Sequence, residues 1–164
     1  METERLILRL YNESDKDYLI RLFTDEKVMK FVDTGVFSQQ KAEDVWLKLI
    51  EDFYPKGITT IYGVFDKFSG HYIGHATIRP RPTKKDEWEI SYILRNEEWD
   101  KGYATEIARR LVEFGFNELK LNAVYATVDT DNYASIRVLE KIGMKHIRDE
   151  YDEQGKFYLY GIIS

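Results

Sequence analysis

The chain has 164 residues, a length that suits one domain with its own hydrophobic core. Its formal net charge is −5 with both signs mixed along the chain, so no basic stripe indicates a nucleic-acid-binding protein. The chain contains no cysteine, which excludes disulfides, thiolate metal sites and cysteine nucleophiles. Residues 1–5 have no signal-peptide character, and no apolar run approaches the ~20 residues that span a bilayer. We therefore expect a cytoplasmic protein with no membrane partner.

The first part of the chain predicts one strand followed by helices. Residues 4–10 alternate in hydropathy, as a strand does. Apolar residues then recur at helical spacing, and Asn12, Ser14 and Ser38 are candidate N-caps. The predicted helices cover residues 15–23, residues 25–31 with Phe31 turned inward, and a longer segment from Ser38 to Pro55 that carries the stripe Trp46, Ile50 and Phe53. We interpret this stripe as core rather than as an acceptor pocket.

The remainder predicts strands interrupted by two helices. The predicted strands are residues 58–66, 71–79, 88–94, 123–129, 144–151 and 156–163, and the predicted helices are residues 103–119 and 133–142. A polar loop around Pro80, Pro82, Thr83 and Lys84 precedes the third of these strands. Parallel neighbours need a crossover, so the helix 103–119 should join two parallel strands of a mostly antiparallel sheet. The order predicts a single mixed α/β domain with about seven strands and about four helices.

The turn at residues 99–106, Trp-Asp-Lys-Gly-Tyr-Ala-Thr-Glu, lies between a predicted strand and the start of a predicted helix. A helix start presents backbone N–H groups without intrahelical partners and favours an anion. Gly102 and Ala104 would let phosphates approach the backbone closely. The P-loop and the dinucleotide fingerprint are both missing from the sequence. We interpret the turn as a pyrophosphate cradle; the alternative is an ordinary strand-to-helix turn.

A second segment, Asn-Tyr-Ala-Ser-Ile-Arg-Val-Leu-Glu-Lys-Ile-Gly-Met at residues 132–144, follows about thirty residues later. With both segments present, the chain resembles the GNAT superfamily of acetyl-CoA-dependent N-acetyltransferases. Within it, the chain is similar to the ribosomal-protein N-terminal (alanine) acetyltransferases. Residues 3–9 and 25–31 also resemble this branch. The resemblance covers nearly the whole chain and implies a GNAT-like α/β (α+β) single domain.

The resemblance implies how acetyl-CoA would bind. The pantetheine arm would lie between the splayed strands 88–94 and 123–129, pairing with the backbone of Tyr92, Ile93 and Leu94. The side chain of Asn132 would bond the arm; the alternative role of Asn132 is to cap the following helix. Backbone N–H groups would hold the pyrophosphate at Asp100, Lys101, Gly102, Tyr103, Ala104 and Thr105.

The resemblance also implies catalytic roles. Glu89 matches a glutamate beside the acceptor site and would act as the base, directly or through water; the alternative is a solvated or ion-paired carboxylate. Ser135 would protonate the thiolate, unless it only caps the helix. Many relatives use a tyrosine four residues later, where this chain has Leu139. Ser91 replaces the usual glycine, which narrows the ligand-facing side of the strand.

The three histidines show no metal spacing, so we expect no metal. His71 and His75 lie four apart on a predicted strand, and His75 is a minor alternative base.

Two functions remain open at this point. The first is transfer of acetyl from acetyl-CoA to a primary amine, either a protein N-terminal α-amine or a small-molecule amine, in a direct ternary complex. The second is a non-catalytic acyl-CoA-binding regulatory module of the same fold. The first helices and residues 80–86 are expected to set acceptor specificity, and the chain is expected to be a monomer or a homodimer.

Overall fold

The computed structural model describes residues 1–32, 35–82, 84–153 and 155–164. Thr83, in the expected polar loop, and Gln154, in the expected closing turn, lie outside the described residues. The chain forms two compact units, one from residues 1–76 with 93–101 and one from residues 77–92 with 102–164. Each unit is described separately below. Among the helices of the described segments, none combines the length and the apolar character that a bilayer crossing requires.

The described residues form one seven-stranded sheet in the order β1-β2-β3-β4-β5-β7-β6, which confirms the predicted number of strands. Five α-helices accompany it in the described residues, one in each of the five segments where the sequence predicts a helix and one more than the approximate total of four. The strands are β1 (Leu6–Arg9), β2 (Ile61–Asp66), β3 (Tyr72–Pro80), β4 (Trp88–Leu94), β5 (Ala123–Asp129), β6 (Lys145–Asp152) and β7 (Gly155–Ile163). The helices are α1 (Lys16–Phe23), α2 (Glu26–Met29), α3 (Gln39–Leu47), α4 (Tyr103–Asn117) and α5 (Tyr133–Lys141).

In the first unit, short polar side chains start the helices. Asp25 accepts hydrogen bonds from two backbone amides of α2, at 2.9 and 3.2 Å. Ser38 accepts from the amide of Lys41 at 3.2 Å at the start of α3. Asn12 caps the 3₁₀ turn Glu13–Asp15 that leads into α1. These bonds satisfy donors that a helix start leaves open. The predicted caps Asn12 and Ser38 are confirmed, whereas Ser14 donates to Asn12 instead of capping a helix and Asp25 is a cap that the sequence analysis did not predict.

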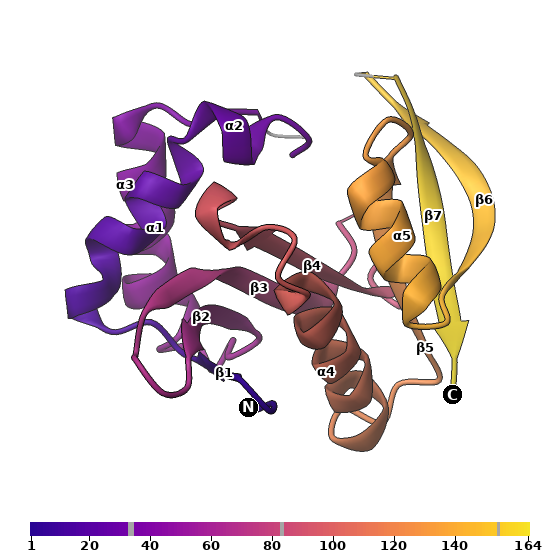
Figure 1. The fold of residues 1–164 in the computed structure, drawn as a ribbon, viewed down its shortest axis with the longest axis horizontal. Helices are drawn as coiled ribbons and strands as arrows, with labels where there is room; N and C mark the ends of the chain where they lie inside the picture. Colours follow the sequence, from indigo (N-terminus) through magenta and orange to yellow (C-terminus); the bar gives the residue numbers. More distant parts are fainter. Residues whose placement is uncertain (33–34, 83, 154) are drawn as a thin grey trace. The chain divides into compact units, whose positions relative to one another are not determined.

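Helices α1 and α3 pack against each other in this unit (Figure 1). Trp46 is 5% exposed and lies in the core cluster, with Ile50 and Phe53 packed against that cluster, so the predicted core role of this stripe is confirmed. The inward orientation expected for Phe31 is wrong, because α2 ends at Met29 and Phe31 is 38% exposed. The buried members of the core are Tyr11, Leu19, Ile20, Leu22, Phe23, Val28, Met29, Phe37, Ala42, Trp46, Leu49, Phe65 and Tyr72.

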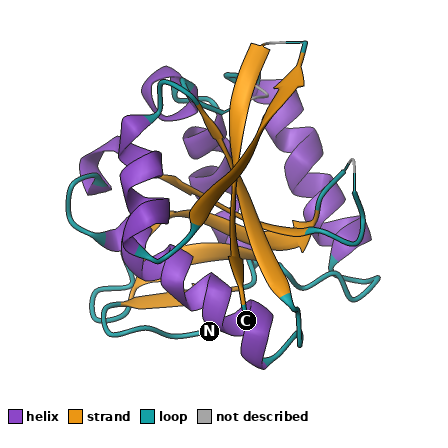
Figure 2. Cartoon of the chain, turned by 90° about the vertical axis from the view of Figure 1, so that its right-hand side faces the viewer, coloured by secondary structure: helices purple, strands orange, loops and turns teal. Residues whose placement is uncertain are grey.

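In the second unit, β7 lies between β5 and β6. The antiparallel β5–β7 pairing runs from Ala123 opposite Ile163 to Asp129 opposite Phe157. Strands β6 and β7 form the closing hairpin, whose paired strands are seen at the top of Figure 2. Helices α4 and α5 contact each other, and both contact β5. Alternate residues of β5, such as Val124 and Val128, are buried beneath this layer.

Strands β4 and β5 are parallel and α4 connects them, which confirms the predicted crossover. The structure records a single residue pair between them, Glu89 with Tyr125. Within this unit, the ladder is therefore interrupted after Glu89, while the other edge of β5 stays paired along its length. The backbone of β4 at Ile90–Tyr92 thus has an edge that is not closed by β5.

Candidate functional site

Helix α4 begins without a capping side chain. Its N-cap is Gly102, with φ +81°, a left-handed conformation that glycine adopts at little cost. Helices α2, α3 and α5 each have a side chain that accepts from the first turn, whereas α4, like α1, has no such side chain among the described residues. The structure therefore places the predicted cradle residues Gly102 to Thr105 at the start of a 15-residue helix, where the backbone and its dipole favour an anion.

In the first unit, the segment that leads to this helix is held by side chains outside it. Arg5 Nη1 donates to the Lys101 carbonyl at 3.0 Å, and Trp99 Nε1 donates to the Leu94 carbonyl at 3.0 Å. Asp100 has φ +59°, a conformation in which non-glycine residues are uncommon. These contacts fix the backbone at Asp100 and Lys101, two of the predicted binding residues.

Glu98 adds an ionic contact to the same segment. It is 6% exposed, and its two oxygens lie 3.0 Å from Lys101 Nζ and 3.0 Å from His71 Nε2. Burial raises the pKa of Glu98, but the hydrogen bonds and charges of Lys101 and His71 leave the pKa below its ordinary value. Sequence analysis missed Arg5 and Glu98, because the contacts of Arg5 with Lys101 and of Glu98 with His71 join residues distant in the sequence.

In the second unit, Asn132 and Ser135 meet at the start of α5. Asn132 Oδ1 accepts from the Ser135 amide at 3.1 Å, so the alternative that Asn132 caps this helix is realised. The Ser135 side chain also lowers the pKa of the Tyr92 hydroxyl on β4. Two residues that the sequence assigned separately, Tyr92 to the cofactor and Ser135 to catalysis, are thus brought together.

The hydroxyl of Tyr92 is buried and has no hydrogen-bond partner of ordinary geometry among the described residues. Burial is the larger influence on it and raises the pKa of Tyr92 to about 12, against the opposing effect of Ser135. Buried polar groups in native proteins are usually hydrogen-bonded, so this hydroxyl is an exception. Sequence analysis used only the backbone of Tyr92.

Glu89 lies among arginines. It is 8% exposed, and its carboxylate oxygens lie 3.6 Å from Arg79 Nη2 and 3.6 Å from Arg81 Nε. The ion-paired alternative is therefore realised in the structure. A carboxylate oxygen is a hydrogen-bond acceptor, so these guanidinium groups hold the proposed base in place.

Arg81 connects Glu89 to a larger ionic network. Arg81 is 4% exposed and pairs with Glu87 at 2.5 Å and with Glu150 of β6. Arg148, also on β6, lies 2.6 Å from Glu150 and 3.3 Å from Glu87. Hydrogen bonding to Arg81 is the largest influence on Glu150 and lowers its pKa. This network was missed because Arg148 and Glu150 lie some sixty residues away from Arg81 and Glu87 in the chain.

Two other residues that the sequence analysis named, Ser91 and His75, are hydrogen-bonded to side chains of other elements. Ser91 Oγ lies 2.9 Å from Thr77 Oγ1 of β3. The hydroxyl that stands where the family usually has glycine is therefore hydrogen-bonded to a side chain of β3. In the first unit, His75 is 7% exposed, with Nδ1 3.0 Å from the Tyr11 hydroxyl and its ring stacked on Tyr11. Across the described residues, no group of three or more acidic or histidine side chains is arranged to hold a metal ion.

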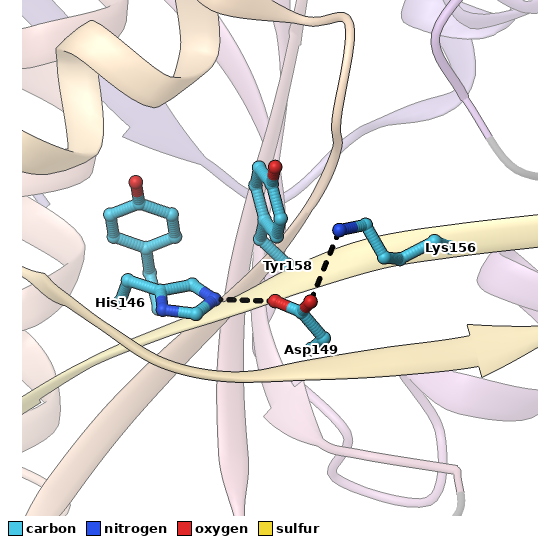
Figure 3. A pocket seen from close by; sticks show the side chains of 5 residues that line it. His146, Asp149, Lys156 and Tyr158 are labelled. Carbon is cyan, nitrogen blue, oxygen red and sulfur yellow. Dashed lines mark hydrogen bonds and ion pairs between the residues drawn. The ribbon is translucent and has the colours of Figure 1, made fainter.

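An open hollow of about 350 Å³ lies on the closing hairpin (Figure 3). Asp149 accepts a hydrogen bond from His146 at 2.9 Å and from Lys156 at 3.1 Å, and Tyr158 and Tyr160 complete the lining. No residue proposed from the sequence lies here. The hollow is separate from the groups at the start of α4 and α5.

Comparison with known proteins gives consistent results. The model of the family "Acetyltransferase (GNAT) domain" matches residues 5–145. The chain is 35% identical to the protein YkkB of Bacillus subtilis, over 88% of this chain and 84% of that protein. It is 26% identical to the N-acetyltransferase p20 of Bacillus licheniformis, over 99% and 94%.

Solved structures share the fold. A GNAT-family acetyltransferase from Bacillus anthracis superposes with a TM-score of 0.85 at 25% identity, covering 99% of this chain and 97% of that chain. A spermidine N-acetyltransferase from Vibrio cholerae, solved with CoA and spermine, has a TM-score of 0.80 at 17% identity and covers 96% and 95%. The family match and the shared fold agree with the two motifs at residues 99–106 and 132–144. The chain therefore belongs to the GNAT family of acetyl-CoA-dependent acetyltransferases.

Proposed function

We propose that this protein transfers the acetyl group of acetyl-CoA to a primary amine. The observation that carries the proposal is the start of α4, where Gly102 has a positive φ and no side chain caps the helix. The start of a 15-residue helix that has no capping side chain favours binding of a phosphate group. In a chain of this family, that group is the pyrophosphate of CoA.

Three features of the described residues suit acetyl-CoA. Backbone N–H groups from Gly102 to Thr105 would hold the pyrophosphate, together with Asp100 and Lys101 of the preceding segment. The edge of β4 at Tyr92 that β5 does not pair would accept the pantetheine arm as an added strand. The backbone of Ile93 and Leu94 would continue that pairing. Asn132 uses its carbonyl oxygen as a helix cap, and its amide nitrogen is suited to donate to the arm.

The chemistry assigns complementary tasks to two side chains. The amine nitrogen must be neutral when it attacks the thioester carbonyl; a carbon–nitrogen bond forms, the carbon–sulfur bond breaks, and sulfur keeps the electron pair. Glu89 would accept the proton that the amine loses, directly or through a water molecule. Ser135 would donate a proton to the departing thiolate and recover one from solvent. The protein has no cysteine, so an acetyl-cysteine intermediate is excluded, and the acetyl group would pass directly between the two substrates in a ternary complex.

The need for a base depends on the acceptor. At pH 7 roughly a tenth of an α-amine is neutral, but under a thousandth of a lysine-type amine, from pKa values near ~8 and ~10.4. Glu89 therefore matters more for a polyamine or a lysine than for a protein N-terminus.

Cationic amines are the acceptor class that we propose. The net charge of −5 attracts cations in general. Structural neighbours are named for two different acceptors: the spermidine N-acetyltransferase from Vibrio cholerae and the ribosomal-protein-S5-alanine acetyltransferase from Vibrio fischeri. A relative from Aspergillus fumigatus is named FsC-acetyl coenzyme A-N(2)-transacetylase. Small polyamines and protein N-terminal amines are therefore the first acceptors to compare.

A second candidate function is acyl-CoA binding without turnover. Leu139 occupies the position where many relatives carry a catalytic tyrosine, and this observation favours a regulatory module. Such a module would bind acetyl-CoA, while changes at Glu89 or Ser135 would leave every measured rate unaltered.

The test is release of free CoA from acetyl-CoA in the presence of spermine, spermidine, an aminoglycoside and a peptide with N-terminal alanine. Transfer to at least one amine, slowed in Glu89→Gln and Ser135→Ala but unchanged in the exposed control Glu97→Gln, supports the enzyme. Acetyl-CoA binding without transfer across the panel supports the regulatory module. Absence of both binding and transfer rejects the proposal.

A further inference from the structure

His71 lies beside the segment that leads to the proposed phosphate site, in the first unit. Its Nε2 atom is 3.0 Å from one carboxylate oxygen of Glu98 and 3.1 Å from Nη1 of Arg95. The other carboxylate oxygen of Glu98 lies 3.0 Å from Nζ of Lys101. A single ring nitrogen of His71 therefore contacts both the carboxylate that holds Lys101 and a neighbouring cation.

The two contacts of Nε2 require opposite hydrogen positions. An arginine nitrogen can only donate a hydrogen bond, so the contact with Arg95 requires Nε2 without a proton. Burial raises the pKa of Glu98, but hydrogen bonds from Lys101 and His71 leave that pKa below its ordinary value. An ionised carboxylate can only accept, so the contact with Glu98 requires Nε2 with a proton. His71 can therefore bind only one of these two partners at a time.

The charge of His71 decides between the two partners. Protonated imidazole has a donor on each nitrogen and no acceptor, so this form binds Glu98 and is repelled by Arg95. Neutral imidazole can carry its proton on Nδ1 and accept from Arg95 at Nε2, and one oxygen of Glu98 then loses its partner on the ring. Histidine is the side chain whose charge ordinarily changes between about pH 5 and 8. The contact of His71 with Glu98 is therefore sensitive to pH in the physiological range.

The other groups around this histidine allow the exchange. The pKa of Asp66 is lowered first by hydrogen bonds from the turn that follows it and also by the charge of His71. Arg95 has two further acceptors: the Tyr72 carbonyl is 3.4 Å from Nη1, and a carboxylate oxygen of Glu97 is 3.5 Å from Nη2. The guanidinium can therefore leave Nε2 without losing its other partners.

We propose that His71 is a pH-sensitive switch that strengthens acetyl-CoA binding when it is protonated. This inference rests on the proposed function, because it needs Lys101 to belong to the pyrophosphate site. Protonated His71 fixes the Glu98 side chain through one oxygen, and the other oxygen then holds the side chain of Lys101. Arg5 already holds the Lys101 carbonyl at 3.0 Å. The residue that directly precedes Gly102 in the chain is thus ordered from both its side chain and its backbone.

The sign of the pH effect follows from which form makes the contact. A contact of the protonated form is present at low pH and is lost as the pH rises and His71 releases its proton. Acetyl-CoA should therefore bind more tightly at pH 6 than at pH 8. By linkage, a proton that strengthens binding is itself held more strongly in the complex. Binding of acetyl-CoA at pH 7 should consequently take up a fraction of a proton at His71.

The first test compares the Kd for acetyl-CoA of the unaltered protein and of His71→Gln, measured by calorimetry at pH 6 and pH 8. Acetyl-CoA itself carries a phosphate monoester that changes charge near pH ~6, and the comparison of two proteins cancels this effect. The ratio of the Kd at pH 8 to the Kd at pH 6 should be about two- to fivefold larger in the unaltered protein. This is the size expected for one ionic contact of a half-exposed side chain.

His146→Gln is the matched control. The Nε2 atom of His146 also lies near a carboxylate, at 2.9 Å, and its side chain is 44% exposed against 49% for His71, but it belongs to the closing hairpin. Its ratio of Kd values should equal that of the unaltered protein. Calorimetry in two buffers of different ionisation enthalpy then counts the protons taken up at pH 7. The count should be lower in His71→Gln and unchanged in His146→Gln.

A second variant tests the exchange of partners at Nε2. Arg95→Met removes the group that competes for this nitrogen, so neutral His71 keeps its proton on Nε2 and its contact with Glu98. The ratio of Kd values should fall toward that of His71→Gln. A ratio in Arg95→Met equal to that of the unaltered protein would overturn the proposal, because the choice between two partners would then have no effect on binding.

The experiment separates this inference from the proposed function. If the unaltered protein binds acetyl-CoA with the same ratio and the same proton count as His71→Gln, the acetyl-CoA site stands and the switch is rejected. Binding that is weaker in His71→Gln by one factor at both pH values also rejects the switch, since His71 would then only support the segment. If the unaltered protein binds no acetyl-CoA at either pH, the proposed function fails and the switch fails with it.

Discussion

Arg81 Nε lies 3.6 Å from the Glu89 carboxylate, while the rest of the same guanidinium pairs with Glu87 and Glu150. One buried arginine thus forms ion pairs with three carboxylates: Glu89 of β4, Glu150 of β6 and Glu87, which directly precedes β4. The proposed base is therefore not an isolated carboxylate. Its position depends on a group that would not touch the substrates.

Removing the arginine charge should destabilise the protein strongly. Arg81→Met leaves three buried or half-buried carboxylates without their main counter-charge, and breaking such a pair typically costs about 3 to 5 kcal/mol. Urea unfolding followed by circular dichroism measures the change. The control is Arg110→Met, because Arg110 pairs with an exposed Glu118, and it should cost under about 1 kcal/mol. Equal effects of the two changes would show that the network contributes nothing special.

The same network predicts how stability depends on pH. Glu150 and Glu87 have pKa values below the ordinary value of 4.5 in the folded protein. A lowered folded pKa means that the unfolded chain binds more protons, so the contribution is present above pH 4.5 and is lost as pH falls through the folded values. The free energy of unfolding should therefore decrease below about pH 4.5. The decrease should be shallower in Arg81→Met, and an identical slope in both proteins would contradict this assignment.

The ionic contact at Lys101 should affect acetyl-CoA binding. Glu98→Gln removes the charge that holds Lys101 Nζ, while Glu97→Gln changes a neighbouring side chain that is 60% exposed. We expect a several-fold higher Kd for acetyl-CoA in Glu98→Gln, with Glu97→Gln unchanged, because an exposed charge contributes little. Calorimetric titration measures both. A Kd that is unaltered in Glu98→Gln would mean that this contact does not organise the loop.

The loss caused by Glu89→Gln should depend on the acceptor. A lysine-type amine must lose a proton far more often than an α-amine before it reacts at pH 7. The fall in kcat/KM should therefore be larger for spermine than for a peptide with N-terminal alanine, and the difference should shrink as the assay pH rises toward 9. Rates that fall equally for both acceptors at every pH would show that Glu89 acts on the fold and not on the amine proton.

The sequence predicted helices and strands correctly where several local signals agree. Helix α4 begins at Tyr103 and β5 spans Ala123–Asp129 as expected, because glycine, apolar periodicity and β-branched residues all agree there. The error at Phe31 arose because the apolar pattern continues past the last residue of α2. A pattern of apolar residues does not say where a short helix stops when no glycine or proline follows directly.

In the candidate site, the sequence predicted the turn and the helix starts but not the long-range side-chain contacts. Gly102 and Asn132 carry local signals, a small residue at a turn and a cap before a helix, and both lie where these signals placed them. The contacts of Lys101 with Arg5 and of Arg81 with Glu150 join segments that are distant in the sequence, and nothing near Lys101 or Arg81 indicates these partners. Long-range pairs of charged and hydroxyl groups depend on strand register and packing, which a single sequence does not display.

The most direct test of the central claim is calorimetric titration of acetyl-CoA into the protein and into Gly102→Glu. Gly57→Glu is the matched control, because Gly57 also has a positive φ of 77° and open space around it. The account predicts binding by the unaltered protein and by Gly57→Glu, and loss of binding in a folded Gly102→Glu. Equal binding by all three proteins would contradict the assignment of the α4 start as the phosphate site.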